Sequence, residues 1–327
     1  SRSWVWENTW SVGSTFGYVL MPFIALLIFV PEFGKIYALT PAKDIWMIYV
    51  FGLIQGSGAF VMIYVCTVIG MALGFTLNMS CIALFSLLVP LFLAHRDRVT
   101  KLDGITLLIG AALLVVGFVI GGRAGLAREA RGAPDERKGG PKEKLGIPFL
   151  VIATLWSGLA NSMYYFTFEF QKSMKVTAIE KFGVEPFAWG FLNMFPFFVG
   201  MFTVNFLLMG IKMAKQGTLR NFWSAPGLGR EYLLGIAMSL MWYLGQGVAY
   251  PAAQAIMGPL GVAVGAALLM GTIMVASNVA GISTGEWKGS PPRTMRALYI
   301  AIAFFVVASA VVSVGNYLQQ YVLEVAP

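Results

Sequence analysis

The sequence predicts an all-α protein that crosses a membrane several times. Of its 327 residues, 58% are hydrophobic and only 12% are charged, which is about half the charged fraction of a typical soluble domain. The mean hydropathy of the chain is +0.75. Its apolar residues gather in runs that can cross about 30 Å of hydrocarbon as helices, and they lack the two-residue alternation of transmembrane β-strands.

Nine apolar runs follow one another along the chain. They cover residues 10–30, 45–66, 68–94, 105–121, 147–168, 187–211, 232–250, 256–282 and 297–318. We therefore expect nine transmembrane helices.

Two features inside these runs predict how the helices bend and pack. Pro22 and Pro196 lie inside the first and sixth runs, where a proline removes a backbone hydrogen bond and bends the helix. Bends at matching positions of two halves point to a binding site. Pairs of glycines spaced by four residues predict close helix contacts; they are Gly52/Gly56, Gly70/Gly74, Gly117/Gly121 and Gly261/Gly265.

A polar segment at residues 122–146 divides the chain. It holds seven Lys/Arg and four acids, and we expect its Gly and Pro residues to interrupt any helix. With a cytoplasmic N-terminus, the cytoplasmic segments hold 15 Lys/Arg and the opposite side 8, together the 23 of the chain. Cytoplasmic loops carry an excess of Lys and Arg. The segment is therefore predicted to be a basic cytoplasmic connector between a first half, 1–121, and a second half, 147–327.

The two halves are unequal, with four apolar runs before the connector and five after it. Halves of five helices would have opposite orientations, which is the inverted-repeat plan of many secondary transporters. The start of the chain also parallels residues 185–200, because in both an acid precedes a Trp and then an interrupting Pro. We therefore expect ten helices in the full protein as a 5+5 inverted repeat, with the first helix absent from this sequence.

The sequence predicts no enzyme, no cofactor and no metal site. Residues 281–285 match G-x-S-x-G, but a nucleophile elbow needs a preceding strand and a His partner. An apolar run precedes this Ser, and His95, the single His of the chain, falls on the other side of the predicted membrane. Cys66 and Cys81 lie in apolar runs, where buried thiols are the default. The net charge of +8 resides in short loops, so we expect no nucleic-acid partner.

Uncharged polar residues inside the apolar runs are the candidate substrate ligands. Each costs free energy unless it is satisfied, and helix–helix hydrogen bonding is the alternative explanation for all of them. A neutral polyol would need such groups together with aromatic rings. Trp242, Gln246 and Tyr250 are spaced four apart and share one face of a regular α-helix. The predicted substrate-binding residues are Trp10, Gln55, Asn161, Asn193, Trp242, Tyr243, Gln246 and Tyr250.

Glu7 and Glu169 are the candidate proton-coupling residues. A proton-coupled carrier usually needs an ionisable group that its cavity can reach, and both carboxylates lie near the ends of apolar runs. Aromatic residues flank both, so anchoring at the membrane interface is the alternative.

Several segments resemble one family of bacterial transporters. They are WVWENTWSV at 4–12, the stretch from Gly56-Ser-Gly58 to Gly70–Gly74, MWYL at 241–244, and Glu286-Trp287 followed by Pro292-Arg293. These segments resemble the L-rhamnose–proton symporters of the drug/metabolite transporter superfamily, in register from Ser3 to the last run. The matching positions are Trp6, Glu7, Trp10, Trp242, Tyr243, Glu286 and Trp287. Ala59, Val61 and Thr67 depart from the polar and basic residues of the family pattern.

The resemblance implies a ten-helix fold and proton-driven import of a sugar across the bacterial inner membrane. We therefore expect a multi-pass secondary active transporter of a small polar metabolite, with a sugar such as L-rhamnose as the first choice, surrounded by membrane lipid. An exporter of the same superfamily and a non-transporting subunit that scaffolds a larger complex are the alternatives. Protein partners are left open.

Overall fold

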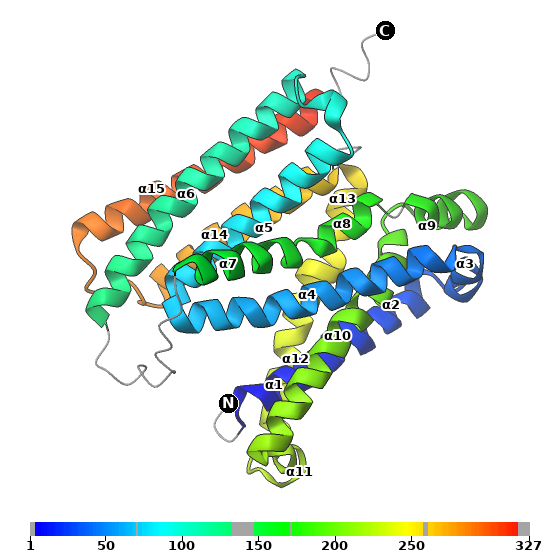
Figure 1. Cartoon of the computed structure of the whole chain (residues 1–327), viewed down its shortest axis with the longest axis horizontal. Helices are drawn as coiled ribbons and strands as arrows, with labels where there is room; N and C mark the ends of the chain where they lie inside the picture. Colours follow the sequence, from blue (N-terminus) through cyan, green and yellow to red (C-terminus); the bar gives the residue numbers. More distant parts are fainter. Residues whose placement is uncertain (1–3, 70, 133–146, 171, 258–260, 320–327) are drawn as a thin grey trace. The chain divides into compact units, whose positions relative to one another are not determined.

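The computed structural model describes residues 4–69, 71–132, 147–170, 172–257 and 261–319, and every regular element in these ranges is a helix (Figure 1). Eight of the described helices are long and apolar enough to span a membrane. They are Trp6–Phe29, Ala42–Val68, Gly74–Leu93, Leu102–Arg128, Trp189–Gln216, Leu228–Ile256, Gly261–Ser283 and Pro292–Tyr317. The predicted class, an all-helical polytopic membrane protein, is confirmed.

The fifth predicted span is divided into two helices. α7 (Ile147–Asn161) is followed by one turn residue, Ser162, and then by α8 (Met163–Phe170). At this turn the Gly158 carbonyl accepts hydrogen bonds from both the amide and the hydroxyl of Ser162, at 3.1 and 2.8 Å. Eight continuous spans are therefore described, and the counts of nine and ten remain predictions.

The fourth predicted span is longer than expected. α6 (Leu102–Gly132) continues 11 residues beyond the expected end at 121 and enters the predicted connector. Ala, Leu, Arg and Glu fill residues 123–131, and their high helix propensity outweighs the single interior glycine. The rest of the connector, residues 133–146, lies outside the described residues.

The chain forms two compact units, and each combines two separate stretches of the sequence. The first unit contains Ser1–Ser57 and Thr167–Ile256, and the second contains Gly58–Phe166 and Met257–Pro327. These units are defined by contacts between residues. The halves predicted from the sequence, 1–121 and 147–327, are defined by an internal repeat, which the contacts do not test, so they remain a prediction.

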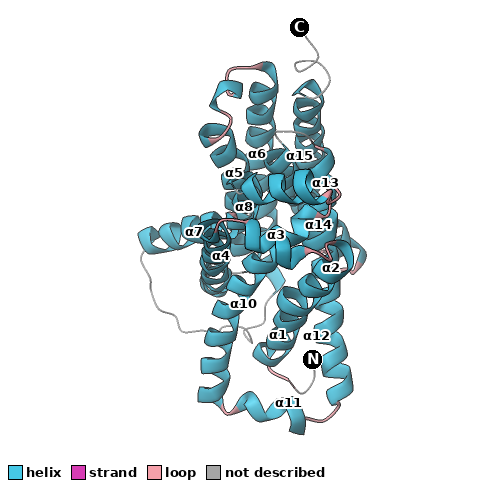
Figure 2. Cartoon of the chain, turned by 90° about the vertical axis from the view of Figure 1, so that its right-hand side faces the viewer, coloured by secondary structure: helices cyan, strands magenta, loops and turns pink. Residues whose placement is uncertain are grey.

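The first unit is built around the long helix α10. α1 (Trp6–Thr15), the π-helix η1 (Phe16–Leu20) and α2 (Met21–Phe29) form one span that packs on α10 (Trp189–Gln216) and α12 (Leu228–Tyr243). α4 (Ala42–Ile69) also lies close to α10, because a Cβ at Gly52 would be 2.0 Å from the Phe197 carbonyl oxygen. The unit also contains three helices too short to span a membrane: α3 (Phe33–Leu39), α9 (Lys172–Val176) and the π-helix η3 (Thr177–Lys181). α11 (Asn221–Ser224) joins the ends of α10 and α12 (Figure 2).

The second unit is a set of long helices in direct contact. α6 packs along α15 (Pro292–Tyr317), and α5 (Met71–Leu93) packs on α6, α7 and α14 (Gly261–Ser283). Figure 1 shows α6 and α15 side by side over most of their length. A Cβ at Gly117 would be 2.8 Å from the Phe305 ring, and one at Gly121 would be 3.4 Å from Ala301 Cβ. The glycine pairs predicted at 52/56 and 117/121 therefore lie at helix contacts.

Candidate functional site

Two helices of the first unit lose their regular α-helical winding close to a proline. η1 ends at Leu20, and Pro22 follows; η5 (Leu244–Ala249) ends one residue before Tyr250, and Pro251 follows in α13 (Tyr250–Ile256). Proline lacks the amide hydrogen, so the carbonyl four residues earlier loses its regular helical partner. Short π-helical segments of this kind are rare and are frequent at functional sites.

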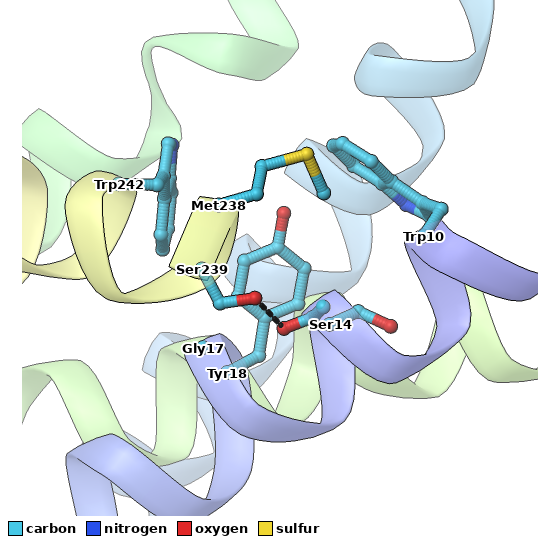
Figure 3. A pocket seen from close by; sticks show the side chains of 8 residues that line it. Trp10, Ser14, Gly17, Tyr18, Met238, Ser239 and Trp242 are labelled. Atoms are coloured by element: carbon cyan, nitrogen blue, oxygen red, sulfur yellow. Dashed lines mark hydrogen bonds between the residues drawn. The ribbon is translucent and has the colours of Figure 1, made fainter. Parts of the chain in front are cut away.

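A cavity of about 70 Å³ lies where α1 and η1 face α12. Figure 3 shows its lining, which is Trp10, Gly13, Ser14, Gly17, Tyr18, Met238, Ser239 and Trp242. The glycines allow the two helices to approach, because a Cβ at Gly13 would be 3.0 Å from Ser239 Oγ. Ser239 Oγ donates to the Gly13 carbonyl at 2.8 Å, which fixes α12 directly to the backbone of α1.

Two indole rings stand at opposite sides of this cavity, with Met238 between them (Figure 3). Trp10 Nε1 donates a 2.7 Å hydrogen bond to Oδ1 of Asn205, a fully buried residue of α10. Trp242 lies edge-on to Tyr18 at 5.0 Å between ring centroids and 5.4 Å from Phe198. Hydrogen bonding and ring contacts therefore hold both indoles in place.

The hydroxyl of Tyr18 points into the cavity between the indoles (Figure 3). Only 5% of Tyr18 is exposed, and its ring stacks on Phe198 at 5.9 Å. Within the described residues, no hydrogen bond involves this hydroxyl. The hydroxyl oxygen is not fully buried, and it is available to donate to or accept from a ligand hydroxyl.

The lining therefore combines two aromatic faces with a free hydroxyl, which is the combination expected for a small polyol with apolar C–H faces. The volume of about 70 Å³ is well below the roughly 300–1,000 Å³ of typical small-molecule pockets. In this conformation the cavity is narrow. Met238, a flexible unbranched side chain, occupies the space between the indoles.

Two of the predicted substrate-binding residues, Trp10 and Trp242, line this cavity. Tyr243, Gln246 and Tyr250 are not among the lining residues. Residues 244–249, which include Gln246, form a π-helix, and the cavity lining ends at Trp242 on this span. Tyr250 instead packs on Phe168 at 5.6 Å between ring centroids.

The other three predicted ligands also lie outside the lining. Gln55 is buried on α4 in the first unit. Asn193, fully buried on α10, donates from Nδ2 to Thr167 Oγ1 at 2.7 Å. Asn161 belongs to the second unit and donates to the Ser157 carbonyl at 2.8 Å, a bond within its own helix.

Both candidate coupling carboxylates are buried and paired with a lysine. Glu7 is 3% exposed, and its Oε1 lies 2.5 Å from Lys212 Nζ, which also stands 5.0 Å from the centre of the Trp6 ring. Glu169 is 4% exposed, and its Oε1 lies 3.4 Å from Lys172 Nζ. Glu7 also lies three residues before Trp10 on α1, one helical turn from the cavity wall.

The prediction missed Tyr18, Met238, Ser239 and Asn205. One signal was present in the sequence: Gly13 and Gly17 are spaced as a GxxxG pair and face Gly235 and Ser239, which have the same spacing. That pattern would have placed α1 against α12 and brought Tyr18 beside Trp242.

Comparisons with known proteins agree on one family. The family model of the L-rhamnose-proton symport protein (RhaT) matches residues 1–317. The L-rhamnose-proton symporter of Cronobacter sakazakii is 23% identical over 96% of this chain and 90% of its own length. Those of Escherichia coli and Citrobacter koseri are 24% and 22% identical, over 96% of this chain and 91% of their own lengths. No solved structure gives a significant match.

Proposed function

The chain belongs to the L-rhamnose-proton symport protein family, and we propose that it moves a sugar together with protons across the bacterial inner membrane. A symporter carries its substrate unchanged, in agreement with a chain that is not an enzyme. The apolar spans give it the multi-pass membrane location that such transport requires.

The observation that carries this proposal is the cavity between α1–η1 and α12. A pyranose has apolar C–H faces and a rim of hydroxyls, so the indoles of Trp10 and Trp242 can cover its faces while the Tyr18 hydroxyl pairs with its rim. L-Rhamnose, the substrate that names the relatives, is the first substrate to test. Gln55, Asn161, Asn193, Tyr243, Gln246 and Tyr250 remain proposed ligands of another conformation.

Glu7 is our proposed proton carrier, and Glu169 is the second candidate. Glu7, in the first turn of α1, forms an ion pair with Lys212 of α10. Protonation of Glu7 removes the negative charge of this pair and so weakens the contact between the two helices. Release of that contact would let α1 move against α10 and open the cavity wall. Symport follows if the sugar and the proton favour the same open state.

We also propose the ten-helix, 5+5 inverted repeat of the drug/metabolite transporter superfamily. The way the units combine helices supports this plan. In the second unit, α5 and α6, the last two spans before the connector, pack with α14 and α15, the last two spans of the chain. In the first unit, the span containing Pro22 packs on α10, which contains Pro196, and both prolines are buried.

Sugar counterflow in proteoliposomes that contain only this chain tests the transport proposal. Vesicles loaded with L-rhamnose should accumulate labelled L-rhamnose transiently and saturably. Tyr18→Phe removes one hydroxyl and should weaken the apparent affinity about tenfold, equivalent to about 1.4 kcal/mol. Absence of counterflow with any sugar, combined with stoichiometric copurification of other subunits, would favour the scaffolding alternative.

A further inference from the structure

We propose that the first unit also binds an anionic phospholipid at a site separate from the sugar cavity. A groove of about 480 Å³ lies between the α1–η1 segment and α10 and is bounded at one end by α11. This volume falls within the roughly 300–1,000 Å³ of ligand pockets. Its apolar lining includes Phe16, Phe202, Phe206, Met213, Leu219 and Phe222.

The lining suits a hydrocarbon chain and not a polyol. Ser11, Ser14 and Thr15 also line the groove, but each hydroxyl donates to a backbone carbonyl of its own helix, at 2.8, 3.1 and 2.8 Å. Because these donors are already used, the groove presents mainly aromatic and aliphatic surface. Burial of an acyl chain there contributes about 0.8 kcal/mol for each CH₂ group.

One end of the groove has the features of a membrane–water interface. Trp4 donates from Nε1 to the Asn221 carbonyl at 2.9 Å and lies edge-on to Phe222 and Tyr232, at 5.5 and 4.8 Å between ring centroids. The neighbouring Trp223 is 71% exposed. Trp and Tyr rings concentrate at this depth of a bilayer. A lipid with its headgroup at this level would direct its chain towards Phe202 and Phe206 in the apolar part of α10.

The charges around this end select an anionic headgroup. Lys215, Arg220 and Arg230 each lie within two residues of a residue that lines the groove, and all three are exposed. Within the described residues none of them forms an ion pair, whereas nearby Lys212 pairs with Glu7. Basic clusters at helix ends on the cytoplasmic side bind anionic lipid headgroups. A phosphatidylglycerol phosphate would balance charges that a zwitterionic lipid leaves unbalanced.

Gly210→Leu tests the groove itself. Gly210 lines the groove, and a Cβ there meets nothing within 4 Å, so a leucine enters the groove without a clash. The change also raises helix propensity, so folding should not suffer. Native mass spectrometry of the delipidated full chain, titrated with phosphatidylglycerol, should show about tenfold weaker binding than the wild type. Gly34→Leu, at an equally open glycine of α3, is the matched control and should bind as the wild type does.

The charge selection is tested with a triple variant, Lys215→Gln, Arg220→Gln and Arg230→Gln. Phosphatidylglycerol binding should fall about tenfold or more, while phosphatidylcholine binding stays as weak as in the wild type. The control triple variant, Lys288→Gln, Arg293→Gln and Arg296→Gln, removes the same charge on the same predicted side of the membrane and should change neither.

Three outcomes would overturn the proposal: equal binding of the two lipids by the wild type, equal loss of phosphatidylglycerol binding in both triple variants, or wild-type binding by Gly210→Leu. If Gly210→Leu lowers thermal stability, the two triple variants alone decide.

Discussion

The two units of this transporter differ in where their helices depart from regular α-helical winding. In the second unit, α6 and α15 are regular helices that pack through small residues, with Gly110 against Val312 and Gly117 against Phe305. In the first unit, the first span and α12–α13 pass through π-helical segments and prolines beside the cavity between α1–η1 and α12. The second unit has its own interruptions, between α7 and α8 and at Pro90 inside α5, but the cavity proposed for the sugar lies in the first unit. We propose that the first unit carries the transport chemistry and that the second unit supports it.

Removal of the proposed coupling carboxylate should produce the largest effect. In Glu7→Gln, uphill accumulation of sugar should fall to the equilibrium level while counterflow persists, because counterflow needs no proton movement. Proteoliposomes with and without an imposed pH gradient provide the measurement, and Glu169→Gln is the parallel variant. Uphill transport that survives in both variants would remove both carboxylates from the coupling mechanism.

Gly117→Leu should mainly damage stability. The added side chain would enter the Phe305 ring at the contact between α6 and α15, since a Cβ alone would be only 2.8 Å away. Overpacking of this kind costs about 3 kcal/mol, which thermal unfolding in detergent can detect. The protein that still folds should bind sugar with unchanged affinity. If sugar affinity changes while thermal stability stays normal, the second unit takes part in binding, which contradicts a purely supporting role.

Trp242→Phe should weaken sugar binding about tenfold, through the loss of about 1.4 kcal/mol of stacking and contact. Gln246→Leu is the informative comparison, because Gln246 lies outside the cavity lining in this conformation. Titration of intrinsic fluorescence with sugar gives both affinities. If both variants lose sugar affinity equally, the result would instead support a binding face formed by Trp242, Gln246 and Tyr250 together.

Met238→Ala should have the smallest effect and change selectivity. The side chain fills the space between the indoles, so its truncation enlarges the cavity without touching the Tyr18 hydroxyl. Transport of L-mannose, which adds one hydroxyl to L-rhamnose, should rise about fivefold relative to L-rhamnose, or about 1 kcal/mol. Competition between the two sugars in counterflow measures the ratio of L-mannose to L-rhamnose transport. An unchanged ratio would show that Met238 does not contribute to substrate selection.

The fold class was predictable because long apolar runs have few other solutions. The break at Ser162 was not, since nothing in the apolar run marks that position: Ser80 and Ser86 make the same hydroxyl-to-carbonyl bond inside the unbroken helix α5. Extension of α6 to Gly132 was missed because the Gly and Pro residues of the segment were expected to interrupt any helix, although residues 123–131 are mostly good helix formers.

The candidate site was half visible in the sequence. Trp242 was predicted because aromatic rings beside polar residues are typical of ligand sites, and Trp10 because it matches the family pattern; both line the cavity. The free hydroxyl of Tyr18 depends on which neighbours surround it, and a single sequence does not contain that information. Gln246 was expected in the site because it lies four residues after Trp242, but it is not among the lining residues in this conformation, and residue spacing does not show where along a helix a cavity ends.

Ser14 lines both the cavity proposed for the sugar and the groove proposed for lipid, so the two share one short segment of α1 as a wall. Two ligands that press on one movable wall are thermodynamically linked, and the linkage is reciprocal. If the lipid tightens sugar binding by some factor, the sugar must tighten lipid binding by the same factor. The phospholipid composition of the bilayer would then act as an allosteric effector of this carrier, and its sugar affinity would be a property of protein and membrane together.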